Sequence, residues 1–377
     1  MDGSIRIGRL FGIPILLHYT FLLVIPLFAW IIGSQIVETT DLLNDIFRVT
    51  VDTTLISGIY MPYIIGTVIA LGLFFGVLIH ELAHSIVARK KGLKMQSITL
   101  LMFGGIAQMD EGVPDPRVEL PMALAGPVMS LIFGIVCCGL VYAVPVMTDV
   151  PATAGVLIFV FGYLGILNII LCAFNLLPAF PMDGGRVLRA VLAQRMPLHR
   201  ATRIAANVGK GFAIIFGIVG IFLLSPFLLL IALFIYIGAG MESSSAEYRF
   251  LLQDVTVGAM MSAPVTTVPP NLPVAKVIEM MYASKHLGFP VVDRGALVGM
   301  ITLVDLNRTS AIDRDAMQVR DMMSHDPVTL PPTAPVIDAL RLMAAKNISR
   351  IPIVDAGEIV GIVTRTDILK VTELKQI

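Results

Sequence analysis

The sequence predicts a polytopic α-helical membrane domain, with about six transmembrane helices and a small membrane-associated β segment, followed by an α/β domain built from two similar halves. Three observations predict this architecture. The 377 residues are 56% hydrophobic and only 14% charged, whereas ordinary soluble proteins carry about 25% charged residues. Long uncharged stretches give way near residue 242 to ordinary soluble patterning. Beyond that point the sequence contains an internal repeat.

Six apolar segments are predicted to be transmembrane helices, since a helix needs roughly 20 apolar residues to cross a bilayer. The last of them is short and begins at Pro226. The first follows Arg6 and Arg9 and has no small-residue cleavage site after it, so we expect it to be retained as a span rather than removed as a signal peptide. The six segments lie at residues 14–33, 62–89, 120–145, 152–177, 204–224 and 226–241.

The charged residues between these segments predict the orientation. Arginine and lysine gather at residues 6–9, 89–94 and 186–203, whereas the loop at 34–61 carries four acidic residues and one arginine. The positive-inside rule therefore predicts a multi-pass protein of the cell membrane with both termini in the cytosol. An even number of crossings agrees with this orientation.

Two segments do not fit simple transmembrane helices. Residues 93–112 are apolar and rich in strand-forming residues, but Gly104 and Gly105 interrupt them. Residues 178–185 contain two prolines and two glycines directly after an apolar helix. Irregular backbone at membrane depth is tolerated only where protein or a water-filled cavity satisfies its polar groups. Both segments are therefore predicted to line a site.

The motif that carries chemistry is His80-Glu81-Leu82-Ala83-His84, late in the second apolar segment. Histidines four residues apart on a helix project from one face and can bind one metal ion. Glu81 points about 100° away around the helix, so it can reach water bound by that metal and act as general base. The alternative is a pair of satisfied helix histidines beside a snorkelling carboxylate, but three ionisable residues in an apolar span are costly without a function.

Zinc in a catalytic site takes three protein ligands and leaves the fourth position for water. Asp183 is the best candidate for the third ligand. Pro178 and Pro181 would end the preceding helix, and the glycines after Asp183 let the chain turn close to other backbone. This geometry could bring the carboxylate back to face the histidine pair. The alternative is that Asp183 caps the next helix.

Two motifs together resemble the site-2 protease family of intramembrane zinc metalloproteases, over about residues 5–241. They are the histidine motif at 80–84 and Asn175-x-x-Pro178-x-x-Pro181-x-Asp183-Gly184-Gly185. Phe103-Gly104-Gly105 and Ala125-Gly126-Pro127 belong to the same resemblance.

The resemblance implies one zinc ion bound by His80, His84 and Asp183, with Glu81 acting as general base and then as general acid. It also implies that the amide of Asn175 stabilises the oxyanion that develops on the scissile carbonyl. The alternative for Asn175 is a helix-terminal hydrogen bond to backbone. The implied substrate is a transmembrane protein within the lipid bilayer.

A helical substrate hides its scissile carbonyl, so the bond must first be presented in extended form. Residues 97–108, with Phe103, Gly104 and Gly105 inside them, could supply an edge strand on which the substrate forms a further strand. This role is a hypothesis that rests on the strand-forming composition and the glycine interruption.

The soluble part repeats with an offset of 62 residues, for example Phe289-Pro290-Val291-Val292-Asp293 and Ile351-Pro352-Ile353-Val354-Asp355. Short β-branched runs alternate with helical patterns in each copy, which predicts two α/β units packed on each other. We therefore predict a membrane domain at 1–241, a linker at 242–253 and a domain at 254–377, with repeats at about 254–310 and 318–373.

The repeats resemble a tandem cystathionine-β-synthase (CBS) domain pair. Thr302 with Asp305, and Thr364 with Asp367, match the CBS positions that contact ribose. A hydroxyl at a strand end and an acid opening a helix can bind sugar hydroxyls, and nearby helix N-termini can receive phosphate. The resemblance thus implies ATP or AMP as ligand, and it leaves open whether two chains associate as a homodimer through the CBS pair. The alternative is ordinary helix capping by both aspartates.

The sequence therefore predicts an intramembrane zinc metalloprotease that cleaves within or near the transmembrane segment of a membrane protein, regulated by adenine nucleotide at its cytosolic CBS pair. The alternatives are a CBS-gated transporter or channel, which has no need of Glu81 beside a histidine pair, and a catalytically silent membrane chaperone. The intact set of metal-binding and base residues speaks against the chaperone. The zero net charge and the lack of a basic block give no sign of a nucleic-acid partner.

Overall fold

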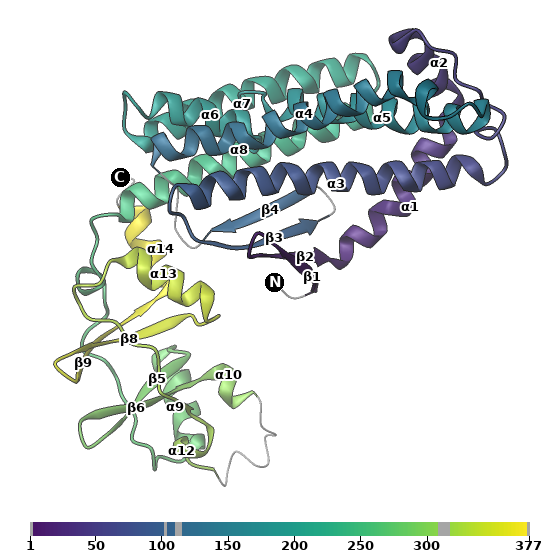
Figure 1. The fold of residues 1–377 in the computed structure, drawn as a ribbon. Coiled ribbons are helices and arrows are strands. Elements are labelled where there is room, and N and C mark those ends of the chain that lie inside the picture. The colour runs from purple at the N-terminus through teal and green to yellow at the C-terminus, as the bar shows by residue number, and fades with distance from the viewer. Residues whose placement is uncertain (1–2, 102–103, 110–114, 308–316, 375–377) are drawn as a thin grey trace. The chain divides into compact units, whose positions relative to one another are not determined.

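The computed structural model describes residues 3–101, 104–109, 115–307 and 317–374 (Figure 1). The chain divides into two compact units, Met1–Ser244 and Ser245–Ile377. The first unit holds the apolar helices and one sheet, and the second holds the internal repeat. The predicted class, a polytopic helical membrane domain plus an α/β domain, is confirmed.

Among the described residues, five helices are long and apolar enough to cross a membrane. A sixth crossing is present if the bent pair α1 (Tyr19–Ser34) and α2 (Ile36–Phe47), which meet at 70°, counts as one span. The five long helices are α3 (Met61–Lys90), α4 (Pro116–Met147), α5 (Pro151–Asn175), α7 (Leu198–Phe222) and α8 (Pro226–Leu252).

The first predicted span, 14–33, is wrong at its N-terminal end. Residues up to His18 form a hairpin, β1 (Ser4–Leu10) and β2 (Ile13–His18), and the helix begins only at Tyr19. Phe11 and Gly12 both have positive φ, +50° and +79°, which gives the two-residue turn that matches the twist of a hairpin. A short apolar run is compatible with strand or helix, and periodicity alone cannot distinguish them.

The hairpin joins β3 (Met95–Leu101) and β4 (Gly104–Met109) in one sheet with the order β1-β2-β3-β4. Strands β2 and β3 are parallel, and the other two pairs are antiparallel. The edge-strand hypothesis for residues 97–108 therefore needs a correction. Strand β3 is internal, between β2 and β4, so of these two strands β4 is the one at an edge of the sheet that the described residues form. The strand β4 packs against α3 (Figure 1).

Helix α3 forms the centre of the membrane unit and packs against α1, α4 and α5. It has Pro62 in its first turn, where the missing N–H costs nothing, and it ends at Lys90, two residues before Gly92, whose φ is +88°. Gly66 allows α1 to approach closely, because a Cβ at that position would lie 2.5 Å from the carbonyl oxygen of Ala29. Small residues that let backbones approach are the usual packing device of membrane helices.

The predicted linker at 242–253 is almost entirely helical. Helix α8 continues without a break to Leu252, because residues 241–252 contain no proline or glycine that would end it. Leu252 then packs in the core of the second unit, together with Val255 and Val257.

The second unit contains the two repeats in closely similar form. The first comprises α9 (Val274–Ser284), β5 (Gly288–Asp293), β6 (Ala296–Thr302) and α10 (Leu303–Leu306). The second comprises α13 (Val336–Ala345), β8 (Arg350–Asp355), β9 (Glu358–Thr364) and α14 (Arg365–Leu374).

The two repeats exchange the segments that open them. Ser262 pairs with Ile362 in β9 of the second repeat, and Ser324, in β7 (Ser324–His325), pairs with Met300 in β6 of the first. These two pairs are related by the offset of 62 residues. The segment that opens each repeat therefore packs in the hydrophobic core of the other repeat: Val257 lies in the core of the second, and Val319 lies in the core of the first.

Candidate metal centre

Helix α3 presents two buried histidines on one face. His80 and His84 are 5% and 8% exposed, and their rings meet edge to face with centroids 4.7 Å apart. Helix α4 orients both rings from the other side. His80 Nδ1 lies 2.9 Å from Ser130 Oγ, and His84 Nδ1 lies 2.6 Å from the carbonyl oxygen of Met122. Partners of this kind fix the ring nitrogen that is left for a metal.

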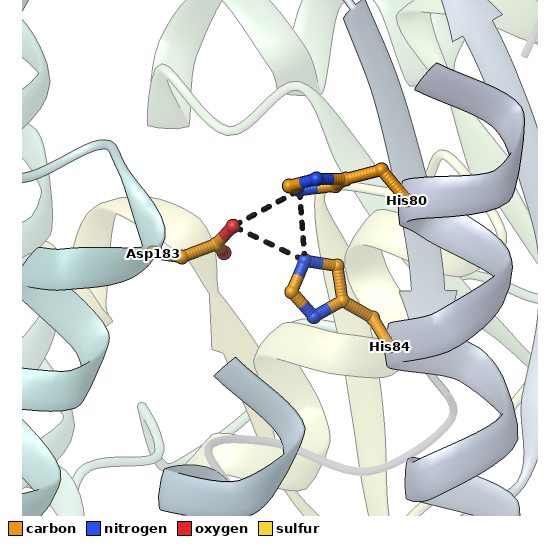
Figure 2. Close-up of side chains that lie close together, drawn as sticks. All are labelled: His80, His84 and Asp183. Atoms are coloured by element: carbon orange, nitrogen blue, oxygen red, sulfur yellow. Dashed lines mark hydrogen bonds and ion pairs between the residues drawn. The ribbon is translucent and has the colours of Figure 1, made fainter. Parts of the chain in front are cut away.

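Asp183 is the first residue of α6 (Asp183–Leu192), and its carboxylate points at the histidines (Figure 2). Met182, not Asp183, occupies the N-cap position of this helix. The following glycines permit the tight turn, because a Cβ on Gly184 would overlap the carbonyl oxygens of Leu176 and Leu177. The structure thus brings Asp183 to the histidine pair, as the proline-glycine pattern predicts.

Three ligand atoms converge at this point. Asp183 Oδ2 is 3.1 Å from His80 Nε2 and 3.1 Å from His84 Nε2, and the two nitrogens are 3.1 Å apart. Tetrahedral zinc, with ligand bonds of about 2.0–2.2 Å, keeps its ligand atoms about 3.3 Å from one another. The triangle therefore has the size that a zinc ion requires.

The chemistry of the donors leads to the same conclusion. The carbonyl oxygen of Met122 can only accept, so His84 Nδ1 carries the proton and Nε2 of the neutral ring carries a lone pair. That lone pair faces a carboxylate oxygen 3.1 Å away. Two acceptors at this distance repel each other unless a metal ion lies beside both or a proton lies between them. The residues present thus fit zinc.

Gly126 of α4 closes the remaining side of the triangle. A Cβ on this residue would overlap His84 Nε2 and lie 2.6 Å from His80 Nε2. It would fill the space that the ion needs, so a side chain at position 126 is incompatible with the site.

Glu81 lies beside the triangle but is not part of it. Its side chain is half-buried and touches β4, because a Cβ on Gly105 would overlap Glu81 Cγ and lie 2.9 Å from Cδ. The backbone of the open-edged strand therefore runs directly past the predicted base. Gly104 has a φ of +128°, which favours glycine, and Phe103 lies outside the described residues.

Asn175 is the last residue of α5, and its Nδ2 donates to the carbonyl oxygen of Leu171 at 3.0 Å. This is the helix-terminal hydrogen bond that the sequence left open as an alternative. Its role toward an oxyanion stays a prediction.

The CBS residues form two matching pairs. Asp305 Oδ2 accepts from the backbone N–H and hydroxyl of Thr302 at 2.9 and 2.6 Å, and Asp367 Oδ2 accepts from Thr364 at 2.9 and 2.7 Å. In both repeats the aspartate thus caps its own helix, as the alternative reading expects. The ribose-binding role of these four residues stays a prediction.

Comparison with known proteins decides the family. Residues 68–153 and 145–216 match the family model of Peptidase family M50, and residues 257–311 and 319–373 match that of the CBS domain. A zinc metalloprotease of Methanocaldococcus jannaschii is 35% identical over 379 residues, which cover 100% of this chain and 99% of that protein. The chain belongs to the site-2 proteases of Peptidase family M50. The resemblance to a site-2 protease with a CBS pair is confirmed.

Two further comparisons each cover one part of this site-2 protease. A solved site-2 protease from Methanocaldococcus jannaschii is 35% identical and covers 64% of this chain and 95% of its own, with a TM-score of 0.42. A CBS domain-containing protein of Bacillus subtilis is 38% identical over 110 residues, which are 29% of this chain and 79% of that protein. Membership of the family makes the chain a zinc metalloprotease with membrane-spanning helices.

Sequence reasoning about this protease missed the residues that hold the site from α4. Ser130 and the carbonyl of Met122 orient the histidines, and Gly126 leaves room for the ion. Gly126 was noted in the sequence only as part of Ala125-Gly126-Pro127, a pattern shared with the family, and not as a residue of the metal site. A glycine and a serine inside an apolar helix are common packing residues, so their sequence carries no signal for a metal site.

Proposed function

We propose that this site-2 protease hydrolyses a peptide bond within or near the transmembrane segment of a membrane-protein substrate, with His80, His84 and Asp183 as its zinc ligands. The observation that carries the proposal is the convergence of three ligand atoms 3.1 Å from one another, two of them on the long apolar helix α3, beside the carboxylate of Glu81. Because two of the ligands lie on a helix that is apolar enough to cross a membrane, a substrate of this site is expected to lie in or beside the bilayer.

When bound, zinc supplies a Lewis acid that polarises the scissile carbonyl and lowers the pKa of water to about 7. Glu81 then takes the proton from the attacking water and returns it to the leaving amine. The amide of Asn175 has two N–H donors, and the bond to Leu171 uses one. The second is left to stabilise the oxyanion.

Removal of the metal tests this function directly. Membranes that contain the protein and its membrane-protein substrates should lose cleavage in a zinc chelator and regain it when zinc is restored, because the ligand triangle holds the ion that the chemistry requires. Mass spectrometry should locate the cut within or near an apolar segment. Cleavage that persists in chelator, or that falls only in soluble loops, would contradict the proposal.

The edge of β4 is proposed to hold the substrate in extended form. Its backbone passes Glu81, and it is the strand of the sheet with an open edge near α3. A substrate strand added here would have its carbonyl groups aligned beside the base. Prolines in β3 cannot test this role, because β3 bonds to strands on both sides and would lose its own pairing.

Ala107→Pro and Gln108→Pro test it better. Adjacent N–H groups of a strand point to opposite sides, so one of the two changes removes a bond to β3 and the other removes a donor from the open edge. We expect the open-edge change to reduce cleavage at least about tenfold while bound zinc stays at one ion per chain. Normal cleavage by both variants would rule out strand addition at β4.

Adenine nucleotide is proposed to regulate the protease through the CBS pair, on the cytosolic side with both termini. The matching Thr302–Asp305 and Thr364–Asp367 pairs lie at equivalent strand-to-helix junctions, where hydroxyl and carboxylate groups can turn to a ribose. Calorimetry on the whole protein should detect heat with ATP or AMP, and Asp305→Ala with Asp367→Ala should abolish it. No heat with either nucleotide would remove this ligand class.

A further inference from the structure

A cluster of three charges, two of them buried, lies close to the metal centre and takes no part in the chemistry described so far. Arg189 is six residues beyond Asp183 on the same short helix and is 4% exposed. It is paired with Glu119, which is 1% exposed, and with Glu242, whose side chain is 38% exposed. A buried ion pair such as that of Arg189 with Glu119 is costly to fold, so its place beside the site calls for an explanation.

The pair with Glu119 ties α6 to α4. Arg189 Nε donates to both carboxylate oxygens of Glu119, at 3.0 and 3.2 Å, and Nη2 donates to one of them as well. Glu119 lies one helical turn before Met122, whose carbonyl orients His84. The guanidinium therefore joins the helix that carries Asp183 to the helix that orients the histidines.

A second contact reaches the segment that leads into Asp183. The guanidinium carbon of Arg189 lies 5.0 Å from the ring centroid of Phe180, a residue that is 1% exposed. A cation over an aromatic face is attractive, most strongly where water is excluded. Arg189 lies after the predicted ligand Asp183 in the chain and contacts Phe180 before it, so it links the two segments that flank the ligand.

The third contact reaches α8, since Arg189 Nη1 donates to Glu242 Oε1. Helix α8 continues past Glu242 to Leu252, which belongs to the core of the CBS unit. Burial would lower the pKa of Arg189, but the two carboxylates hold it above its ordinary value, so the cation persists. The planar fork of arginine binds Glu119 through two nitrogens and still reaches Glu242 through the third, whereas the compact ammonium of lysine has no such fork.

We propose that Arg189 is a positioning residue that sets where α6 holds Asp183 against the histidine pair, and that Glu242 makes this setting depend on α8, the helix that enters the CBS repeats. The proposal rests on the proposed role of Asp183 as a zinc ligand. It assigns the cluster to the geometry of the metal site rather than to stability alone.

The test uses the full-length protein loaded with cobalt(II), whose visible absorption reports the ligand geometry, together with competition for zinc against a chelator. Arg189→Met should shift the cobalt bands and weaken zinc binding at least about tenfold, as loss of a supporting residue does in other metal sites. Arg189→Lys should restore part of both. Glu242→Gln should shift the bands less, keep zinc bound, and lower kcat with little change in KM.

Arg195→Met is the matched control, since Arg195 is an exposed arginine three residues beyond the end of α6. It should leave spectrum and affinity unchanged. If Arg189→Met does not fold, Arg189→Lys and Glu119→Gln carry the same test. Wild-type spectra and zinc affinity in the folded Arg189 and Glu119 variants would overturn the proposal, and a wild-type spectrum and kcat in Glu242→Gln would remove α8 from it.

Asp183→Asn separates this proposal from the function on which it rests. If that change leaves the cobalt spectrum unaltered, the ligand set itself is wrong. If Asp183→Asn alters the spectrum and the Arg189 variants do not, the ligand set stands and the positioning role fails.

Discussion

Glu81→Gln is expected to lower the rate of peptide-bond cleavage by about 10³-fold, within the range that a general acid–base residue contributes. Glutamine has the same shape but can neither accept the proton from water nor return it to the leaving amine. The change should leave one zinc ion per chain, because Glu81 is not among the three converging ligand atoms.

The measurement is the single-turnover rate of a membrane substrate, with bound zinc determined on the same sample. Glu38→Gln, an exposed acid on α2, is the control and should cleave normally. Cleavage by Glu81→Gln within tenfold of the wild-type rate would remove Glu81 from its role. Loss of zinc in the same variant would instead make it a ligand.

Gly126→Ala is expected to weaken zinc binding at least about 100-fold and to abolish cleavage. The added methyl group would overlap His84 Nε2 and crowd His80 Nε2, so the rings or α4 must move and the ligand triangle is lost. Close-packed helices can make room for a methyl group only by moving, and a small displacement of catalytic groups is enough to lower the rate of reaction strongly. Alanine favours the helix more than glycine does, so local helix stability cannot explain a loss.

Gly139→Ala is a matched control on the same helix, because a Cβ there meets no atom of the described residues within 4 Å. Both variants gain the same methyl group in α4, and only the first should lose zinc, as measured by competition with a chelator. Wild-type zinc affinity in Gly126→Ala would mean that the space beside the two histidine nitrogens is not needed for zinc.

Several features could be predicted from the sequence because they are local. The spacing of His80 and His84 fixes their common face on any helix, and the prolines before Asp183 end α5 wherever it packs. The apolar lengths predicted α3, α4 and α5 to within four residues of their ends, whereas α7 begins six residues earlier and α8 ends eleven residues later than predicted. The offset of 62 residues predicted the repeat that the family comparison confirms.

Other features could not be predicted because local pattern permits more than one outcome. Residues 14–18 are apolar enough for a span, and only pairing with β1 and β3 makes them a strand. The same pairing makes β3 an internal strand and leaves β4 as the edge beside Glu81. Sheet order depends on contacts between distant segments, which no short window of sequence contains.

The sequence by itself predicted the family, which the comparisons confirm, and it named the candidate zinc ligands and the change from membrane to CBS patterning. Only the tertiary structure decided how those residues meet: that Asp183 reaches the histidines at 3.1 Å, that Gly126 leaves space for an ion, and that Arg189 joins α4, α6 and α8. The physical reason is that ligand identity is a property of single residues and their spacing, whereas a metal site is a set of distances between helices. Those distances are set by close packing across the whole membrane unit.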